Sequence, residues 1–401
     1  MNSTTKKQSQ FTPKNVVLGV QFLFVAFGAT VLVPLLVGID PAVALFTAGI
    51  GTLIFHLITK GLVPVFLGSS FAFIAPIVES TRLYGLPGTF SGIIAIGLVY
   101  GLISALIKIR GLSFIRRLFP PVVVGPVIMI IGLSLAGTAV DMSKTNWVIA
   151  AISLTTAVIV VVFTKGLIKL IPIFVGIIVG YLTGLLLGVI DFSPIREASW
   201  IGFPEFTAPE FHWQAILYMI PVAIAPIIEH VGDMYAISGV AGKNFVEKPG
   251  LHRTLLGDGI ATSIAGCFGG VPNTTYSEVT GAISLTRVTN PYVLRISAIT
   301  AILFSLIGKI SGFLKTIPQA VLGGIMLLLF GLIASVGIKT LVESKTDMSM
   351  IRNQVIVSLI LTVGIGGAVI SWGNFSLAGI GLAAVVGIIL NLILPQKKQK
   401  K

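Results

Sequence analysis

Long apolar stretches alternate with short polar connections along the whole chain. A helix needs about 20 mainly apolar residues to cross the hydrocarbon core of a bilayer, and fourteen stretches can be read near that length. They lie near 15–37, 42–59, 66–79, 89–108, 119–139, 146–164, 167–190, 214–238, 254–268, 273–286, 292–312, 318–336, 351–370 and 376–394. The third and the tenth stretches are too short or too polar to be uniform helices. The pattern therefore predicts an all-α polytopic membrane protein with fourteen transmembrane segments, two of them interrupted.

The composition excludes a soluble protein. Hydrophobic residues make up 55% of the 401 residues and charged residues only 10%, and the mean hydropathy is +1.02. Soluble chains carry about 25% charged residues, and a soluble surface could not be covered with so few. Fourteen spans would use about 280 residues, so the connections leave no room for a soluble domain.

The net charge of +13 reports orientation in the membrane rather than nucleic-acid binding. With connections assigned alternately from a cytoplasmic N-terminus, the outer ones hold five of the 27 basic residues and the inner ones the other 22. Those five are Arg82, Lys144, Arg196, Lys309 and Lys315. This bias follows the positive-inside rule and predicts that both termini are cytoplasmic. Membrane lipid is thus an expected partner, and nucleic acid is not.

Two segments, one in each half, combine Gly, Pro and small hydroxyl residues. They are 64–73 and 269–278, and aligning Phe71 with Glu278 gives an offset of 207 residues, close to half the chain. With seven spans in each half, the two copies would be inverted relative to each other. Broken helices at matching positions of two halves indicate a transport site near the bilayer midplane. The alternative is that both segments are re-entrant packing elements that bind no ligand.

Four carboxylates fall at or near membrane depth, namely Glu229, Asp233, Asp258 and Glu278. A charge at that depth costs about 2.5–3.5 kcal/mol on insertion scales, so it marks a functional site by default. Glu229 and Asp233 lie four residues apart on one helix face, and burial of such a pair favours a proton on one of them. Glu278 directly follows the second break. We expect proton coupling at Glu229, Asp233 or Glu278, unless these groups only satisfy neighbouring backbone.

Signatures of enzymes are absent from the sequence. The four His show no HExxH spacing, a single Cys cannot build a zinc site, and no GxxxxGK[ST] occurs. No nucleophile paired with a base can be recognised. We predict a protein that is not an enzyme, with no metal site and no cofactor.

Four motifs, in this order and spacing, resemble the nucleobase–ascorbate transporter family along essentially the whole chain. They are PVFLGSSFAFIAPI (64–77), IIEHVGDMYAI (227–237), KPGLHRTLLGDG (248–259) and PNTTYSEVTGAISLTRV (272–288). The last contains the signature core Glu278-x-x-Gly281-x4-Thr286-Arg287. A Glu at the first position of that core is similar to the uracil-type branch of the family.

The resemblance implies a fold of two inverted repeats of seven spans, with short strand-like pieces in spans 3 and 10. Spans 1–4 and 8–11 would form a core domain, and spans 5–7 and 12–14 a gate domain that also forms a homodimer. The implied division is 1–14 cytoplasmic tail, 15–110 core, 111–192 gate, 193–213 extracytoplasmic connection, 214–312 core, 313–395 gate and 396–401 cytoplasmic basic tail.

The activity that the resemblance implies is proton-coupled uptake of a nucleobase, uracil first, across the bacterial cytoplasmic membrane by alternating access. The proton is the coupling ion. Glu229 and Glu278 would bind the base through their side chains, Phe71 and Ser277 mainly through their backbone, and Tyr276 would lie beside them. A purine carrier of the xanthine type on the same fold and a passive channel are the alternatives.

Five positions depart from the family pattern, and the first is Phe22, which stands where the first span often has His. Val279 replaces the usual Asn after the signature Glu, and Phe330 stands where a Tyr often faces the substrate. Asp233 stands where His often follows the Glu-His-x-Gly stretch, and Ser277 replaces Gly. These departures concern the choice of base and the path of the proton rather than the class of protein.

Overall fold

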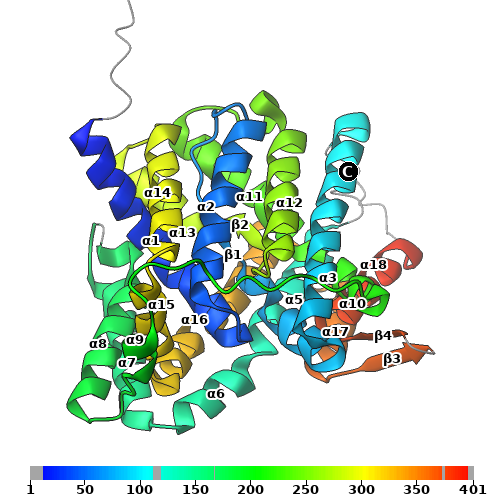
Figure 1. Cartoon of the computed structure of the whole chain (residues 1–401). Coiled ribbons are helices and arrows are strands. Elements are labelled where there is room, and N and C mark those ends of the chain that lie inside the picture. Colours follow the sequence, from blue (N-terminus) through cyan, green and yellow to red (C-terminus); the bar gives the residue numbers. More distant parts are fainter. Residues whose placement is uncertain (1–11, 112–118, 167, 373–374, 396–401) are drawn as a thin grey trace, which may run out of the picture.

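The computed structural model describes residues 12–111, 119–166, 168–372 and 375–395. This part of the chain is mostly helical and contains two small antiparallel sheets of two strands each (Figure 1). The predicted basic tail at 396–401 and most of the predicted N-terminal tail at 1–14 lie outside the described residues.

The first half of the chain runs from α1 to α8. Its elements are α1 (Pro13–Val37), α2 (Pro41–Ile58), β1 (Leu67–Ser69), η1 (Phe71–Phe73), α3 (Ile74–Arg110), α5 (Pro121–Leu133), α6 (Ala136–Lys144), α7 (Trp147–Phe163), η2 (Ile168–Leu170) and α8 (Pro172–Leu186).

The second half runs from α9 to α18. Its elements are α9 (Ser193–Glu197), α10 (Trp213–Met219), η3 (Ile220–Ala223), α11 (Ile224–Ala241), η4 (Val246–Gly250), α12 (Leu251–Cys267), β2 (Asn273–Thr275), α13 (Ser277–Thr286), α14 (Pro291–Ser305), α15 (Gly308–Lys315), α16 (Gln319–Glu343), α17 (Ile351–Ile365), β3 (Val369–Trp372), β4 (Phe375–Ala378) and α18 (Gly379–Ile393).

Several helices begin with a polar cap followed directly by proline. Asp40 accepts a hydrogen bond from the Ala42 N–H at 2.9 Å, and Asn290 accepts one from the Tyr292 N–H at 3.1 Å. A side-chain oxygen at the cap satisfies an N–H that has no partner within the helix. The proline that follows needs no such partner and has the helical φ already.

Among the described residues, six helices are long and apolar enough to cross a membrane. They are Asn15–Val37, Pro41–Ile58, Phe71–Arg110, Pro121–Lys144, Trp213–Ala241 and Gln319–Glu343. The pair α14 and α15, bent by 80°, makes a seventh candidate, and four further apolar helices are shorter. The protein is therefore a multi-pass membrane protein, and the number of fourteen spans stays a prediction.

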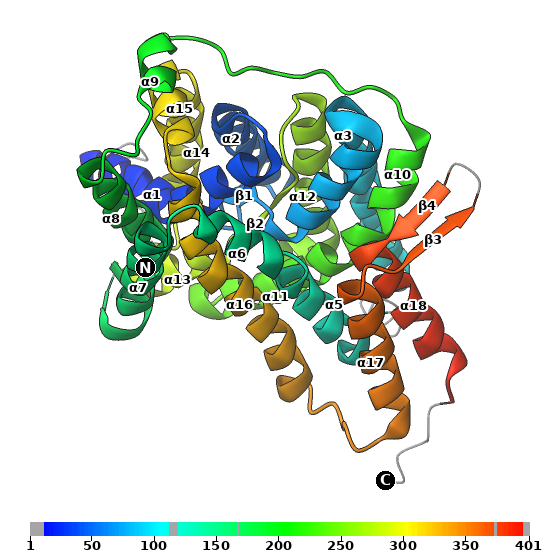
Figure 2. The ribbon, with the colours of Figure 1, turned by 90° about the horizontal axis from the view of Figure 1, so that it is seen from below.

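The helices pack in two groups. In one, α12 packs against α2 and α3, and α14 packs against α1 and α2. In the other, α16 packs against α5, α6 and α7, and α17 packs against α5 and α18. Figure 2 shows α2, α3, α12 and α14 on one side of the molecule and α5, α6 and α16 on the other. α11 packs against α12 and α13, and α13 packs against α1. We name the first set, together with α11 and α13, the α3–α12 group, and the second set the α5–α16 group.

Glycines allow helices to cross closely in each group. A Cβ added at Gly97 of α3 would overlap the carbonyl oxygen of Gly259 in α12, and one added at Gly125 of α5 would lie 2.9 Å from the carbonyl oxygen of Gly337 in α16. Small residues let backbones approach where lipid supplies no hydrophobic drive between helices. The same packing device therefore holds both groups together.

The segment between α9 and α10 crosses one end of the molecule (Figure 2). Gly202 donates its N–H to the Leu306 carbonyl at 3.0 Å, and Glu210 donates its N–H to the Pro87 carbonyl at 3.0 Å. This segment corresponds to the predicted extracytoplasmic connection at 193–213, and its two ends are fixed to different helices.

The α3–α12 crossing gives a test of this packing. We expect Gly97→Ala to destabilise the protein by about 1–3 kcal/mol, because the added methyl has no space without moving α12. Gly101→Ala on the same helix is the control, since its Cβ would meet nothing closer than Leu256 Cδ1 at 3.9 Å. Thermal unfolding of the purified protein in detergent checks this; equal melting temperatures for both variants would contradict it.

Candidate functional site

The two interrupted segments meet as a pair of short strands in the interior. β1 and β2 pair antiparallel with Leu67 opposite Thr275, Gly68 opposite Thr274 and Ser69 opposite Asn273. All six residues are buried. Helical structure begins immediately after each strand, at Phe71 and at Ser277. The structure thus brings together backbone from the two halves of the chain.

This register corrects one detail of the sequence alignment. The strands begin at Leu67 and Asn273 and the helical runs at Phe71 and Ser277, so both pairs are 206 residues apart. Phe71 therefore matches Ser277 rather than Glu278. The offset of 207 was wrong by one residue because sequence alone does not show where strand pairing ends.

Side chains of α2 and α12 hold the outer edges of the strand pair. The Thr52 hydroxyl accepts a hydrogen bond from the Leu67 N–H at 2.8 Å. On the other edge, the Thr262 hydroxyl donates to the Asn273 carbonyl at 3.1 Å. Buried backbone groups need such partners, and here hydroxyls from neighbouring helices supply them.

Hydrogen bonds of Tyr276 join the strand pair to α1. Its hydroxyl donates to the Ser69 carbonyl at 2.9 Å and lies 3.3 Å from the Thr30 hydroxyl. Its ring lies over Gly68, where an added Cβ would come within 2.5 Å of a ring carbon. Only glycine fits at position 68, because the ring of Tyr276 occupies the space that a Cβ would need. Tyr276 itself is buried.

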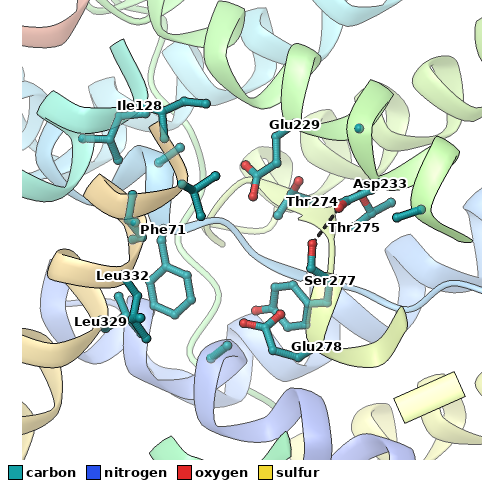
Figure 3. Close-up of a pocket in the computed structure, with 18 of the residues that line it drawn as sticks. Phe71, Ile128, Glu229, Asp233, Thr274, Thr275, Ser277, Glu278, Leu329 and Leu332 are labelled. Carbon is teal, nitrogen blue, oxygen red and sulfur yellow. Dashed lines mark hydrogen bonds between the residues drawn. The ribbon is translucent and has the colours of Figure 1, made fainter. Parts of the chain in front are cut away.

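A cavity of about 870 Å³ borders the ends of the strands. One wall is polar and comes from α11 and from the β2–α13 junction, while the opposite wall is apolar and comes from α5 and α16. Figure 3 shows Glu229, Thr274, Ser277 and Glu278 on the polar wall. Ile128, Leu329, Leu332 and Phe71 lie opposite to them (Figure 3). The cavity thus lies between the α3–α12 group and the α5–α16 group.

All six residues that the sequence singled out for substrate or proton line this cavity. They are Phe71, Glu229, Asp233, Tyr276, Ser277 and Glu278. The structure therefore gathers the predicted residues in one place, although their individual roles stay predictions.

Glu229 and Glu278 have side chains available to a ligand. Glu229 is exposed to the cavity and Glu278 is partly exposed to it. Within the described part of the chain, neither carboxylate has a hydrogen bond or an ion pair with another residue. A carboxylate in such a setting is costly unless a proton or a ligand group satisfies it.

Asp233 is different, because both of its oxygens are occupied. Its Oδ1 accepts a hydrogen bond from the Ser277 hydroxyl, and its Oδ2 accepts one from the Thr275 hydroxyl, both at 2.6 Å. Only 7% of the residue is exposed. Two of the departures from the family pattern, Asp233 and Ser277, therefore contact each other. Together with Thr275 they tie α11 to the β2–α13 junction.

Asp258 lies outside the cavity and is paired. Its Oδ2 lies 3.1 Å from Nδ1 of His230, and both residues are fully buried. Nε2 of His230 lies 3.0 Å from the Thr254 hydroxyl. The pair joins α11 to α12, so Asp258 is an interior group that does not face the cavity.

Two of the other departures do not reach the cavity. Val279 and Phe330 are 1% and 2% exposed, and neither contributes to the lining. The apolar wall of α16 is formed instead by residues such as Leu329 and Leu332. Neither substitution changes the wall of the cavity directly.

Sequence reasoning missed Thr274. It lines the cavity and is 4% exposed, and its hydroxyl has no hydrogen-bond partner among the described residues. Figure 3 places it close to Glu229. No signal in the sequence sets it apart, because Asn273, Thr274 and Thr275 are all polar residues of one short buried strand.

Comparison with known proteins agrees with this geometry. A family described as the Permease family matches residues 13–372. A probable uracil permease of Pasteurella multocida is 53% identical over 96% of this chain and 94% of its own. A probable uracil permease of Haemophilus influenzae is 52% identical over 98% of this chain and 97% of its own. The chain therefore belongs to the Permease family, and the resemblance to the nucleobase–ascorbate transporters is confirmed.

A solved structure shows the same fold with little sequence similarity. The murine Solute Carrier 26 family member A9 anion transporter in its inward-facing state has a TM-score of 0.71 and 11% identity, over 97% of this chain and 69% of that one. Such a likeness concerns the fold alone.

The contact between Asp233 and Ser277 can be measured by a double-mutant cycle. We expect the free energies of unfolding of Asp233→Ala, Ser277→Ala and the double variant to give a coupling of about 1.5–3 kcal/mol, typical of a hydrogen bond to a charged group. A cycle of Asp233→Ala with Ser358→Ala, an exposed serine of α17, should give none. Equal coupling in both cycles would show that the contact is not specific.

Proposed function

We propose that this protein takes up a nucleobase, uracil first, across the cytoplasmic membrane together with a proton. The observation that carries the proposal is the pair of carboxylates, Glu229 and Glu278, facing a cavity at the ends of two broken segments without partners of their own among the described residues. The names of the two relatives, both probable uracil permeases, support uracil as the base.

The donors and acceptors of the site match a planar pyrimidine base. Uracil carries two N–H donors and two carbonyl acceptors. An ionised carboxylate can only accept hydrogen bonds. Glu229 and Glu278 would accept from the N–H groups. The backbone N–H groups of Phe71 and Ser277, at the starts of helical runs, would donate to a carbonyl. The apolar wall of α5 and α16 would cover the ring.

The distribution of partners suggests where the coupling proton binds. Both oxygens of Asp233 already accept hydroxyl hydrogen bonds, so this carboxylate is held by the protein itself. No other described residue donates a hydrogen bond to the side chains of Glu229 and Glu278, and two ionised carboxylates in one cavity repel each other. Of the three predicted candidates, Glu229 and Glu278 are therefore the ones free to take up and release the coupling proton.

Alternating access fits the position of the cavity between the two groups of helices. The cavity extends to Lys169, Lys339 and Glu343, residues that the positive-inside pattern places on the cytoplasmic side. We infer an inward-open conformation of a core, the α3–α12 group, against a gate, the α5–α16 group. Closure toward the cytoplasm and opening toward the outside would follow from rocking or sliding of one group on the other.

Inverted repeats of seven spans are part of the proposal, and matching contacts in the two halves support them. The hydroxyls of Thr52 and Thr262 donate to the carbonyls of Leu67 and Asn273, the first residues of β1 and β2, at 3.4 and 3.1 Å. A Cβ added at Gly49 of α2 would lie 2.5 Å from the Ala298 carbonyl oxygen of α14, and one added at Gly259 of α12 would lie 2.8 Å from the Gly97 carbonyl oxygen of α3. A homodimer formed through the gate is also expected from the resemblance.

Uptake into proteoliposomes tests the function. We expect labelled uracil to accumulate when an inward proton gradient is imposed, and Glu229→Gln or Glu278→Gln to lower uptake about tenfold or more, because a charge-assisted hydrogen bond and a proton site are lost. Glu210→Gln, in the exposed connection, is the control.

The same assay separates the alternatives. Uptake that ignores the gradient in the unmodified protein contradicts coupling. Stronger competition by xanthine than by uracil reassigns the substrate to a purine, and flux that does not saturate indicates a channel.

Thr274 gives a prediction about the binding site that sequence reasoning did not make. Thr274→Val keeps the shape of the side chain and removes the hydroxyl, so we expect the affinity for uracil to fall about fivefold, as for one neutral hydrogen bond. Thr274→Ser should retain most of it. Thr280→Val, outside the cavity lining, is the control. Equilibrium binding of labelled uracil measures this, and an unchanged affinity for Thr274→Val would exclude the contact.

A further inference from the structure

A second concave site lies where the loop after α2 meets the loop before α12. It has a volume of about 310 Å³, and Figure 1 shows the end of α2 and the start of α12 at the same end of the molecule. Its lining consists of Lys60, Leu62, Lys248, Pro249, His252 and Arg253. We call it the basic pocket, because four of these six residues carry a basic side chain.

Within the part of the chain that the structure describes, the basic pocket lacks counter-charge. Among the described residues, the side chains of Lys60, Lys248 and Arg253 take part in no ion pair or hydrogen bond. Arg253 and Lys108, from the end of α3, both act on His252 as neighbouring positive charges. The acidic residue next to the pocket in sequence, Glu247, is exposed and forms no ion pair in this part of the structure. Cations gathered in this way repel each other unless an anion lies among them.

The backbone around the basic pocket is shaped to hold these side chains. Gly250, with φ at 101°, lies against the imidazole of His252, and an added Cβ would come within 2.6 Å of Cε1. The Ser104 hydroxyl donates to the His252 carbonyl at 2.5 Å and ties this turn to α3. The concavity is therefore formed by packed main chain and does not depend on the long side chains alone.

Exposed leucines adjoin the basic pocket. Leu62 is part of its lining and is 38% exposed, and Leu57, on the last turn of α2, is 79% exposed. A soluble anion would gain nothing from them, whereas a phospholipid could place its phosphate among the cations and its acyl chains along the leucines. The positive-inside rule explains basic residues at this end of the molecule, but it does not explain their arrangement around one hollow.

We propose that the basic pocket binds the phosphate of an anionic phospholipid of the cytoplasmic leaflet. Basic pockets between membrane helices on this side recognise such headgroups. Both loops belong to the α3–α12 group, so the lipid would hold this group at the interface while the α5–α16 group moves. Lys60 lies shortly before β1, which begins at Leu67. The pocket is therefore joined through the chain to the segment that carries this strand.

Lipid binding to the purified full chain tests this proposal without any nucleobase. Native mass spectrometry in detergent, titrated with phosphatidylglycerol or phosphatidylcholine, should show at least tenfold tighter binding of the anionic lipid. The triple variant Lys60→Gln, Lys248→Gln, Arg253→Gln should lose this preference. Lys165→Gln, Lys243→Gln, Lys345→Gln changes three exposed lysines outside the pocket and should keep it.

Three outcomes would overturn the assignment. Equal loss of binding in the two triple variants would mean that total charge, rather than the basic pocket, attracts the lipid. Equal binding of the two lipids to the unmodified protein would exclude a headgroup site. Inorganic phosphate that displaces phosphatidylglycerol at equal concentration would assign the pocket to a soluble phosphate. Binding of labelled uracil by each variant shows that the variant is folded. This control does not depend on whether lipid binds.

Discussion

Backbone groups buried between helices must find hydrogen-bond partners, and the pairing of β1 with β2 meets this requirement where the two halves of the chain come together. The six strand residues are buried, so each strand depends on the other and on hydroxyls of α2 and α12. Because the strands end there, two helical runs begin at the edge of the cavity. Unpaired N–H groups at this depth are tolerated only where they face a cavity or a ligand.

The buried carboxylates divide according to their partners. Asp258 is paired with His230, and Asp233 is held by two hydroxyls, so both contribute to the structure around the site. Glu229 and Glu278 face the cavity without partners of their own among the described residues. The two carboxylates with polar partners thus hold the site in place. The two without such partners can bind the substrate or carry the proton.

The sequence predicted much of this arrangement, for identifiable reasons. Apolar length located the helices, and Gly and Pro beside hydroxyl residues located the two breaks. The high cost of a charge in lipid identified Glu229 and Glu278. The register of the strands, the contact of Asp233 with Ser277, and the free hydroxyl of Thr274 were not predictable, because each depends on residues brought together from distant parts of the chain. The motifs carried the family resemblance, and the strand pairing explains why those motifs lie close in space.

An experimental structure of the protein with bound uracil tests the central claim most directly. The account predicts the base in the cavity between α11 and the α5–α16 group, with Glu229 and Glu278 within hydrogen-bonding distance of its N–H groups and the starts of the two helical runs facing its carbonyls. Uracil bound elsewhere, or bound in the cavity with both carboxylates turned away from it, would contradict the account.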